Sequence, residues 1–325
     1  MPDFSVVVPA FNSEKTLGRC LGALFNQSCP KKRYEVIVVD DGSTDGSAEA
    51  AKSFPVRYFF QKNAGPASAR NLGAREAKGA VILFTDADCV AGRDWIKEMT
   101  EPFRAGPEVT AVKGAYRTEQ KSLVARFAQL EFEERFELLK KTPSIDMVDT
   151  YSAAYRREVF LETGGFDTNF PVANNEDTEL SYRLSKAGHK MVFNPRAVVC
   201  HLNHPDSLRR YARLKFWRGY WRMAVYRRFP DKMVKDHYTP QTLKLEILSI
   251  YLLTAGLFSL VPFPRTGIVI TAVSMLSFLF LALPFTASAI KKDPTVAVFT
   301  PALLFLRASS IGAGALWGAV RAKIT

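Results

Sequence analysis

Residues 81–89 read VILFTDADC. The four apolar residues of this stretch, Val81 to Phe84, form an unbroken run that predicts a strand buried on both faces. Two carboxylates, Asp86 and Asp88, follow almost at once. Carboxylates this close repel one another unless a cation or hydrogen-bond donors compensate. Because open α/β sheets bind ligands at the carboxyl ends of parallel strands, the pair indicates either a polar turn or the edge of a binding site.

The first two hundred residues alternate short apolar runs with segments of helical spacing, which predicts an α/β domain with a parallel sheet. Strands are expected at residues 4–8, 35–39, 56–60, 81–84, 190–193 and 197–200. Helices are expected at residues 13–25, 48–54, 67–77 and 120–141. Polar residues follow three of the strands: Pro9 stops the first strand and Asn12 follows it, Asp40 and Asp41 close the second, and Asp86 follows the fourth. We therefore expect one shared cleft at their carboxyl ends.

The chain becomes almost free of charge after Lys244. Residues 247–264 and 266–290 each lack a charge and approach or exceed the ~20 residues that cross a bilayer core. They predict a helical hairpin that spans a membrane. Residues 295–320 are a third candidate, but Arg307 lies in the middle, so this segment either spans with Arg307 facing protein or lies at the interface.

A basic segment precedes these spans. Residues 207–235 hold ten Lys or Arg and a single acid, Asp231, so most of the net charge of +12 is local. Its basic side chains spread around a helical projection, and Trp217 and Trp221 lie among them. This mixture is typical of the headgroup zone of a membrane and also suits a phosphate-bearing ligand. Nucleic acid is a third and weaker alternative, and no nucleic acid partner is expected.

The four cysteines are Cys20, Cys29, Cys89 and Cys200. None forms a CxxC pair, and only Cys200 adjoins a histidine, so reduced thiols are expected rather than disulfides or a cysteine-based zinc site. The first eleven residues have no basic or long apolar segment, which predicts no signal peptide.

Five motifs stand in a recognisable order along the chain: VVVPAFN at 6–12, VVDDGSTDGS at 38–47, NAGPASARNLGAREAKGAVILFTDADC at 63–89, GGFD at 164–167 and NNEDTELSYRL at 174–184. Together they resemble the family 2 glycosyltransferases of the GT-A fold over residues 3–205. The apolar C-terminal region resembles that of membrane-anchored bacterial members. The resemblance implies a GT-A, Rossmann-like mixed sheet domain at 1–205, a basic aromatic interfacial segment at 206–244 and a membrane region with two or three helices at 245–325.

The resemblance also implies an inverting transfer of sugar from a nucleoside-diphosphate donor, UDP- or GDP-linked. Asp88 would be the direct ligand of Mg²⁺ or Mn²⁺, and Asp86 would contact the ribose or the metal shell. The base of the nucleotide would meet Asp41, Pro9 and Phe11. Arg70 would lie near the base or the phosphates. Alternatively, Arg70 is an exposed arginine on a helix. Asp40, beside Asp41, could cap a turn rather than contact the base.

The catalytic base implied by the resemblance is Asp177, with Glu176 beside it. Neighbouring acids can raise one another's pKa if their side chains converge, although acids also simply favour a helix N-terminus. His201 is either a third metal ligand or a loop histidine, and His204 is a weaker candidate of the same kind.

A QxxRW-like motif of processive synthases is missing between residues 200 and 245, which favours addition of a single sugar. The expected acceptor is lipid-linked, in cell-envelope or exopolysaccharide synthesis, with the catalytic domain on the cytoplasmic face of the inner membrane. A polyprenyl-phosphate sugar synthase and a non-catalytic membrane scaffold remain alternatives. A nucleotidyltransferase would need a glycine-rich loop near the N-terminus, and a channel would need more than three spans.

Overall fold

The computed structural model describes residues 1–170 and 174–322, which form two compact units. Unit 1 contains residues 1–119 and 136–204. Unit 2 contains residues 120–135 and the described residues after 204. The two units are described separately.

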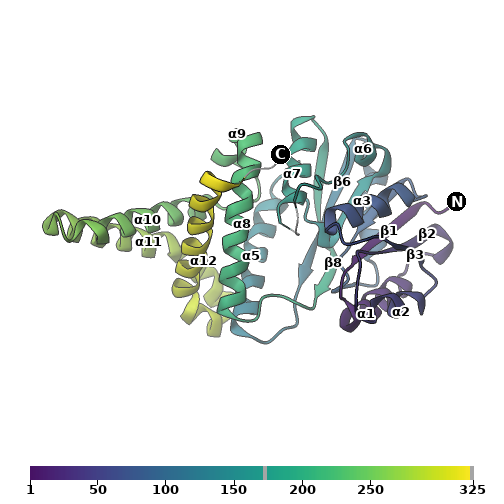
Figure 1. Ribbon diagram of the computed structural model, residues 1–325, viewed down its shortest axis with the longest axis horizontal. Coiled ribbons are helices and arrows are strands. Elements are labelled where there is room, and N and C mark those ends of the chain that lie inside the picture. The colour runs from purple at the N-terminus through teal and green to yellow at the C-terminus, as the bar shows by residue number, and fades with distance from the viewer. Residues whose placement is uncertain (171–173, 323–325) are drawn as a thin grey trace. The chain divides into compact units, whose positions relative to one another are not determined.

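Unit 1 is built on one sheet of eight strands in the order β3-β2-β1-β4-β7-β6-β8-β5 (Figure 1). The strands are β1 (Phe4–Ala10), β2 (Tyr34–Asp40), β3 (Arg57–Phe60), β4 (Val81–Phe84), β5 (Cys89–Ala91), β6 (Val109–Arg117), β7 (Ala153–Arg156) and β8 (Lys190–His201). The first four are parallel to one another, β7 is antiparallel to both β4 and β6, and β5 is antiparallel to β8. The mixed GT-A-like sheet expected from the resemblance is therefore confirmed.

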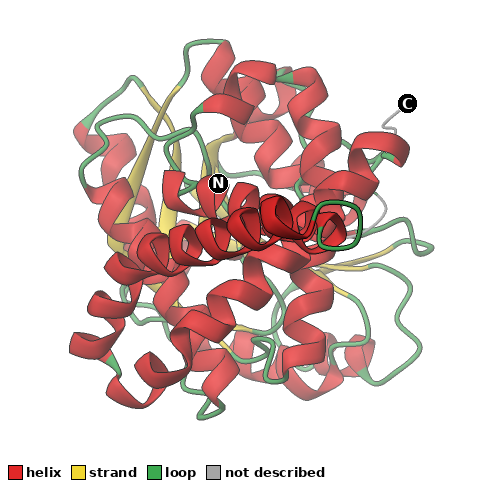
Figure 2. Ribbon diagram, turned by 90° about the vertical axis from the view of Figure 1, so that its left-hand side faces the viewer, coloured by secondary structure: helices red, strands yellow, loops and turns green. Residues whose placement is uncertain are grey.

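The helices of unit 1 connect these strands. They are α1 (Glu14–Phe25), α2 (Ser47–Lys52), α3 (Pro66–Glu76), α4 (Trp95–Ala105), α6 (Arg157–Glu162) and α7 (Glu176–Lys186), with short 3-10 turns η1 (Lys31–Arg33) and η2 (Thr150–Ser152). Figure 2 shows the strands in yellow lying among the red helices. The central strands are mostly apolar because both of their faces are covered, and Val6, Ile37 and Leu83 are completely buried.

The two strands expected at 190–193 and 197–200 are one strand, β8. Its pairing with β6 shifts by several residues between Phe193 and Val198, so the chain bulges there and does not turn. Asn194 fixes the bulge, since its side-chain amide donates to the carbonyl oxygen of Glu98 at 2.8 Å.

Unit 2 is helical over its described residues. Its helices are the first part of α5 (Leu123–Lys140), α8 (Leu208–Arg228), α9 (Pro230–Val234), α10 (Gln241–Ser259), α11 (Pro264–Lys292) and α12 (Pro294–Arg321). Phe127 of α5, Tyr211 of α8 and Phe285 of α11 meet in the centre of its apolar core. By length and composition α10, α11 and α12 could each cross a membrane.

Candidate active site

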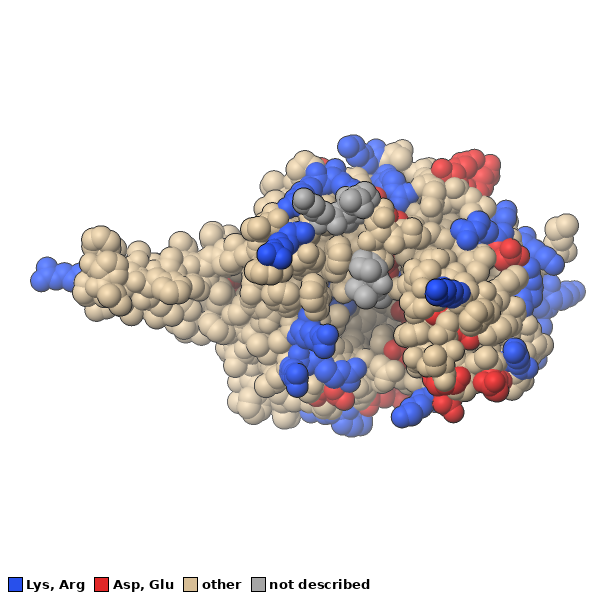
Figure 3. Space-filling view, viewed as in Figure 1, with Lys and Arg blue, Asp and Glu red and all other residues tan. Residues whose placement is uncertain are grey.

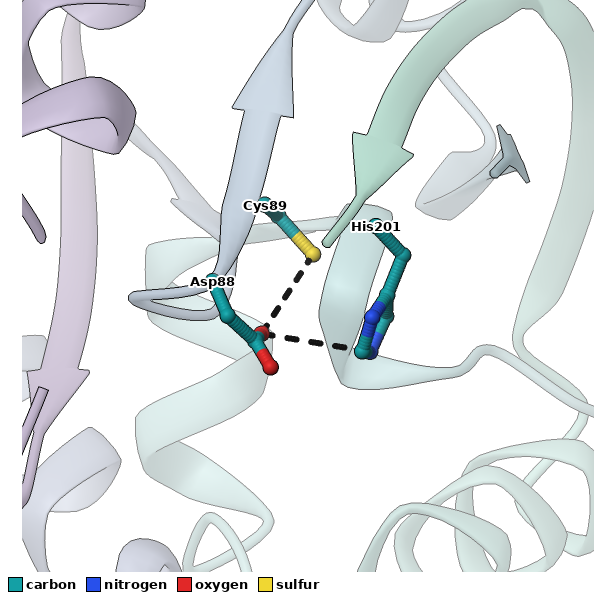
Figure 4. A group of neighbouring side chains, drawn as sticks. All are labelled: Asp88, Cys89 and His201. Atoms are coloured by element: carbon teal, nitrogen blue, oxygen red, sulfur yellow. Dashed lines mark hydrogen bonds and ion pairs between the residues drawn. The ribbon is translucent and has the colours of Figure 1, made fainter. Parts of the chain in front are cut away.

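Three side chains converge beside the acidic motif that follows β4 (Figure 4). The carboxylate oxygen Oδ1 of Asp88 lies 3.9 Å from Nε2 of His201 and 3.9 Å from Sγ of Cys89. Cys89 and His201 are directly opposite each other on the antiparallel strands β5 and β8, so their side chains share one face. The pairing of two strands that are far apart in sequence thus builds the group.

The donor set fits a divalent cation. One ligand atom from each of the three residues lies within 4.8 Å of the others, a separation that leaves room for an ion between them. Burial raises the pKa of Asp88; the nearby Asp86 raises it further, and His201 lowers it. A bound cation would offset the free-energy cost of keeping this buried carboxylate charged. Burial also raises the pKa of the Cys89 thiol, and a protonated thiol is a poor ligand. Asp88 and His201 would therefore hold the ion, with Cys89 as their neighbour.

His201 is held by an aromatic cluster. The ring of Tyr116 lies 5.8 Å from that of His201 and 4.8 Å from that of His204. Tyr151 packs edge-on against Tyr116 at 4.4 Å, and its hydroxyl bonds to the buried Nζ of Lys113 at 2.9 Å. His204 therefore supports the imidazole of His201 from within unit 1, a packing role that its sequence position did not reveal.

Arg70 of α3 is the buried cation of the site. It is only 2% exposed, so the alternative of an exposed helix arginine is wrong. Its Nη2 donates to Asp86 Oδ1 at 2.7 Å, and its Nη1 donates to Glu176 Oε1 at 2.9 Å. One guanidinium therefore joins the acidic motif after β4 to the acidic motif that begins α7.

Glu176 and Asp177 open α7, where the helix dipole favours acids. Glu176 is 2% exposed, and Asn175 before it has a left-handed backbone with φ 67°. Burial raises the pKa of Glu176 to about 7; Asp177 adds to this shift and Arg70 opposes it. Asp177 is more exposed and accepts from the backbone N–H of Thr178 at 2.7 Å. The more accessible acid is therefore the one expected to act as the base.

The GGFD motif contacts both α3 and α7; from α7, Arg183 donates to the carbonyl oxygen of Gly165 at 2.9 Å. Asn71, next to Arg70, donates to the carbonyl oxygen of Phe166 at 2.8 Å and accepts from its N–H at 2.9 Å. Gly165 has φ 68°, and a Cβ there would lie 2.5 Å from the Asn71 side-chain oxygen, so a larger residue would break this clamp. The ring of Phe166 lies 5.8 Å from the Arg70 guanidinium. The motif thus positions the bridging arginine, a function that sequence spacing alone did not indicate.

The acids after β2 hold the loops at the same edge of the sheet. Asp40 accepts from the N–H of Ser43 at 2.8 Å and from the hydroxyl of Tyr58 at 2.7 Å, which fits the turn-capping alternative. Asp41 accepts from Gln61 at 2.6 Å and from the N–H groups of residues 64 and 65. Asp41 therefore fixes the loop that begins α3, and its contact with the nucleotide base stays a prediction.

The residues expected to line the base pocket lie at the carboxyl end of β1. Pro9 is paired with Val39 of β2, and Phe11, just past the strand, is 50% exposed. Because β1, β2 and β4 are parallel, their carboxyl ends share one edge of the sheet, and that edge carries Phe11, Asp41 and Asp86. The shared edge expected from the sequence is therefore present, whereas a cleft at this edge and the contacts of Pro9 and Phe11 with a ligand stay predictions.

Comparison with known proteins identifies the family of unit 1. The family model described as "Glycosyl transferase family 2" matches residues 5–164. The protein named glycosyltransferase AglE of Haloferax volcanii is 26% identical over 63% of this chain and 68% of its own length. The probable glycosyltransferase YdaM of Bacillus subtilis is 30% identical over 69% of the chain, which spans only 54% of that protein.

Residues 5–164 form a glycosyltransferase family 2 domain. The fold agrees, since the mannosyltransferase PcManGT of Pyrobaculum calidifontis, solved with GDP-Man and Mn²⁺, superimposes with a TM-score of 0.60 at 20% identity. That match covers 98% of this chain and 87% of the other. The poly-beta-1,6-N-acetyl-D-glucosamine synthase of Staphylococcus epidermidis is 25% identical over 77% of the chain, which spans 59% of that synthase.

The Arg70 bridge predicts a large stability effect in this glycosyltransferase. Arg70→Ala would leave the buried Glu176 without its cation, and breaking a buried ion pair costs about 3–5 kcal/mol. For a domain of this size we expect the melting temperature of the purified protein to fall by roughly 6–20 °C. Arg75→Ala removes an exposed arginine from the same helix and is the matched control. Equal melting temperatures for the two variants would contradict the bridge.

The pKa of Glu176 predicts a pH dependence of stability. Its folded pKa, about 7, lies above its ordinary value of 4.5, so the folded state binds this proton more tightly than the unfolded state. The stabilising effect of proton binding is fully present below pH 4.5 and is lost as the pH rises to about 7. The stability of wild type relative to Glu176→Gln should therefore fall across this window by an amount on the order of 3 kcal/mol. Thermal unfolding of both proteins from pH 4.5 to 8 measures it; a constant difference would contradict the raised pKa.

Proposed function

We propose that this glycosyltransferase moves a single sugar, with inversion, from a UDP- or GDP-sugar to a lipid-linked acceptor. The observation that carries the proposal is the Arg70 bridge between Asp86 and Glu176. It connects the side of the site that would bind the donor with the side that holds the expected base, Asp177. An acceptor between them would meet the sugar and the base together, as a direct displacement needs.

The transfer breaks one bond and forms another at the anomeric carbon of the sugar. The acceptor hydroxyl oxygen attacks that carbon from the face opposite the diphosphate, so its configuration inverts. Asp177 takes the hydroxyl proton as the new bond forms, and the nucleoside diphosphate leaves with the electrons of the broken bond. Mg²⁺ or Mn²⁺, held by Asp88 and His201 when bound, supplies charge neutralisation for the diphosphate.

Two features support a lipid-linked acceptor and attachment to a membrane. Apolar helices of unit 2 are long enough to cross a bilayer, and α8 before them carries eight basic residues and no acid. Tethering an enzyme to a membrane raises the effective concentration of acceptors in that membrane. We place the catalytic domain on the cytoplasmic face of the inner membrane, because basic residues near the ends of spans stay on the cytoplasmic side.

Mass spectrometry of lipid products tests the acceptor and the number of sugars added. The purified full chain is incubated with labelled donor, Mn²⁺ and a membrane lipid extract. We expect a lipid whose mass increases by one sugar and whose new bond has the inverted configuration. A ladder of masses would contradict single addition, and label confined to water-soluble products would contradict a lipid acceptor.

A further inference from the structure

Three helices of unit 2 could span a membrane by composition, but their surroundings differ. Helices α10 and α11 form a hairpin that projects from the rest of the unit (Figure 1). Its outer part is exposed and apolar, with Phe258 at 78% and Val261 at 89% exposure. Figure 3 shows this projection without charge along its length and with basic side chain atoms at its tip, where the sequence places Arg265. It has the surface of a membrane-spanning pair.

Helix α12, in contrast, lies along charged helices. At its start Asp293 accepts from the guanidinium of Arg126 in α5, with Nε to Oδ2 at 2.7 Å. In its middle, the buried Arg307 pairs with Glu131 of α5 at 3.4 Å and with Glu246 of α10 at 2.7 Å. Glu246 is the sixth residue of α10, within about 8 Å of the first residue of that helix. The middle of α12 is therefore level with the base of the hairpin rather than with its centre.

Beyond Ala308 the helix follows α8. A Cβ at Gly314 would overlap the carbonyl oxygen of Phe216, and one at Gly318 would overlap that of Tyr220. Near the end of α12, Arg227 of α8 donates to the carbonyl oxygen of Ala319. Backbones this close keep the two helices at the same depth. Helix α8, with eight basic residues, cannot enter the bilayer core, where each would cost about 2.5–3.5 kcal/mol.

The opposite face of α12 is exposed and apolar. Its large exposed side chains are Val298, Phe299, Leu316, Trp317 and Val320. At 100° per residue all five fall within about 100° of one another, so they mark one stripe of the helix, in two groups near its two ends. The guanidinium of Arg321 lies 5.1 Å from the ring of Trp317 at the end of this stripe, a pairing typical of the membrane interface.

We propose that only the α10–α11 hairpin spans the membrane and that α12 lies in the membrane plane, with this stripe facing lipid. The proposal rests on the membrane attachment proposed above and adds which helix contacts which layer of the bilayer. Helix α11, at 29 residues, is about 44 Å long and exceeds the ~30 Å hydrocarbon core. The stripe would sink about 5–10 Å, to the boundary between headgroups and acyl chains. Because the hairpin crosses the membrane twice, its two ends lie on the same side of the membrane. Helix α8, which precedes the hairpin, and α12, which follows it, would therefore lie on that side.

Nitroxide depth measurements in vesicles of neutral and anionic phospholipid test this placement. Single cysteines are introduced in the full chain along the stripe, as Val298→Cys, Ser309→Cys and Val320→Cys. The matched controls on α11 are Ile268→Cys, Leu276→Cys and Leu283→Cys, all at exposed apolar positions. Labelled wild type corrects for reaction of the native cysteines. Collisions with oxygen and with a water-soluble nickel complex report the depth of each label.

The proposal predicts equal depths for the three α12 labels, within about 5 Å, near the headgroup boundary. The α11 labels should instead range from one surface to the bilayer centre.

A deepest label at Ser309, with Val298 and Val320 at opposite surfaces, would show that α12 spans. α12 labels shielded from both reagents would show that protein covers the stripe. Either result would overturn the proposal. If the α11 labels also stayed in water, membrane attachment itself would fail, whereas lack of transferase activity would leave the depths unchanged.

Discussion

The Asp88→Ala variant is expected to lose Mn²⁺ binding and, with it, turnover by roughly 10²–10⁴-fold, because charge neutralisation by a metal contributes several kcal/mol. The carboxylate of Asp88 faces both His201 and Cys89, whereas the neighbouring Asp86 is paired with Arg70. Electron paramagnetic resonance of free Mn²⁺ measures the affinity, and release of nucleoside diphosphate measures the turnover. The Mn²⁺ affinity and the turnover should both fall in this variant.

Two controls separate the metal site from general damage. Asp94→Asn changes an exposed acid shortly after β5 that accepts a hydrogen bond from Ser28. Cys89→Ala removes the buried thiol, whose raised pKa makes it a poor ligand. Both variants should keep Mn²⁺ affinity within about threefold of wild type, which corresponds to less than about 0.7 kcal/mol. If Asp88→Ala binds Mn²⁺ as wild type does, the assignment of the metal ligand is wrong.

The Asp177→Asn variant should bind metal and donor normally but turn over about 10²–10⁴-fold more slowly, since a positioned general base contributes that much. The substitution keeps the size of the side chain and its acceptor oxygen for the N–H of Thr178. It removes only the ability to take a proton. Single-turnover transfer with saturating donor measures the chemical step apart from binding.

The matched control for this variant is Asp206→Asn, which neutralises an exposed acid paired with Arg210 outside unit 1. It should turn over as wild type does. Loss of donor binding in Asp177→Asn would assign this residue to binding rather than to proton transfer. Full activity would indicate an acceptor that attacks as an anion, such as a lipid phosphate, and would favour the polyprenyl-phosphate sugar synthase.

The sequence predicted the centre of the sheet well because local patterns determine it. Strands β1, β2 and β4 are buried on both faces, so each contains a run of apolar residues with polar residues soon after it. The same physics predicted that Asp41 and Asp86 would share one edge of the sheet. The helices α10 and α11 were equally predictable from the sequence, because a long segment without charged residues is typical of a membrane span.

Contacts between distant segments were not predictable in this way. Cys200 adjoins His201 in sequence, yet Cys89 is the cysteine whose Sγ joins His201 and Asp88, because β5 and β8 pair across the sheet. The partners of Arg70 come from segments 16 and 106 residues away, and no local period indicates them. Arg307 likewise finds Glu131 176 residues earlier in the chain. Charge pairing over such separations depends on the assembled fold.

The most direct test of the central claim is release of free nucleoside diphosphate from a panel of UDP- and GDP-sugars by the purified full chain. Each reaction is run with and without membrane lipid extract, and with Mn²⁺, with Mg²⁺ or with a chelator. The account predicts release from one donor that needs both the divalent cation and the lipid. Absence of release from every donor, together with absence of donor binding in the presence of metal, would contradict it.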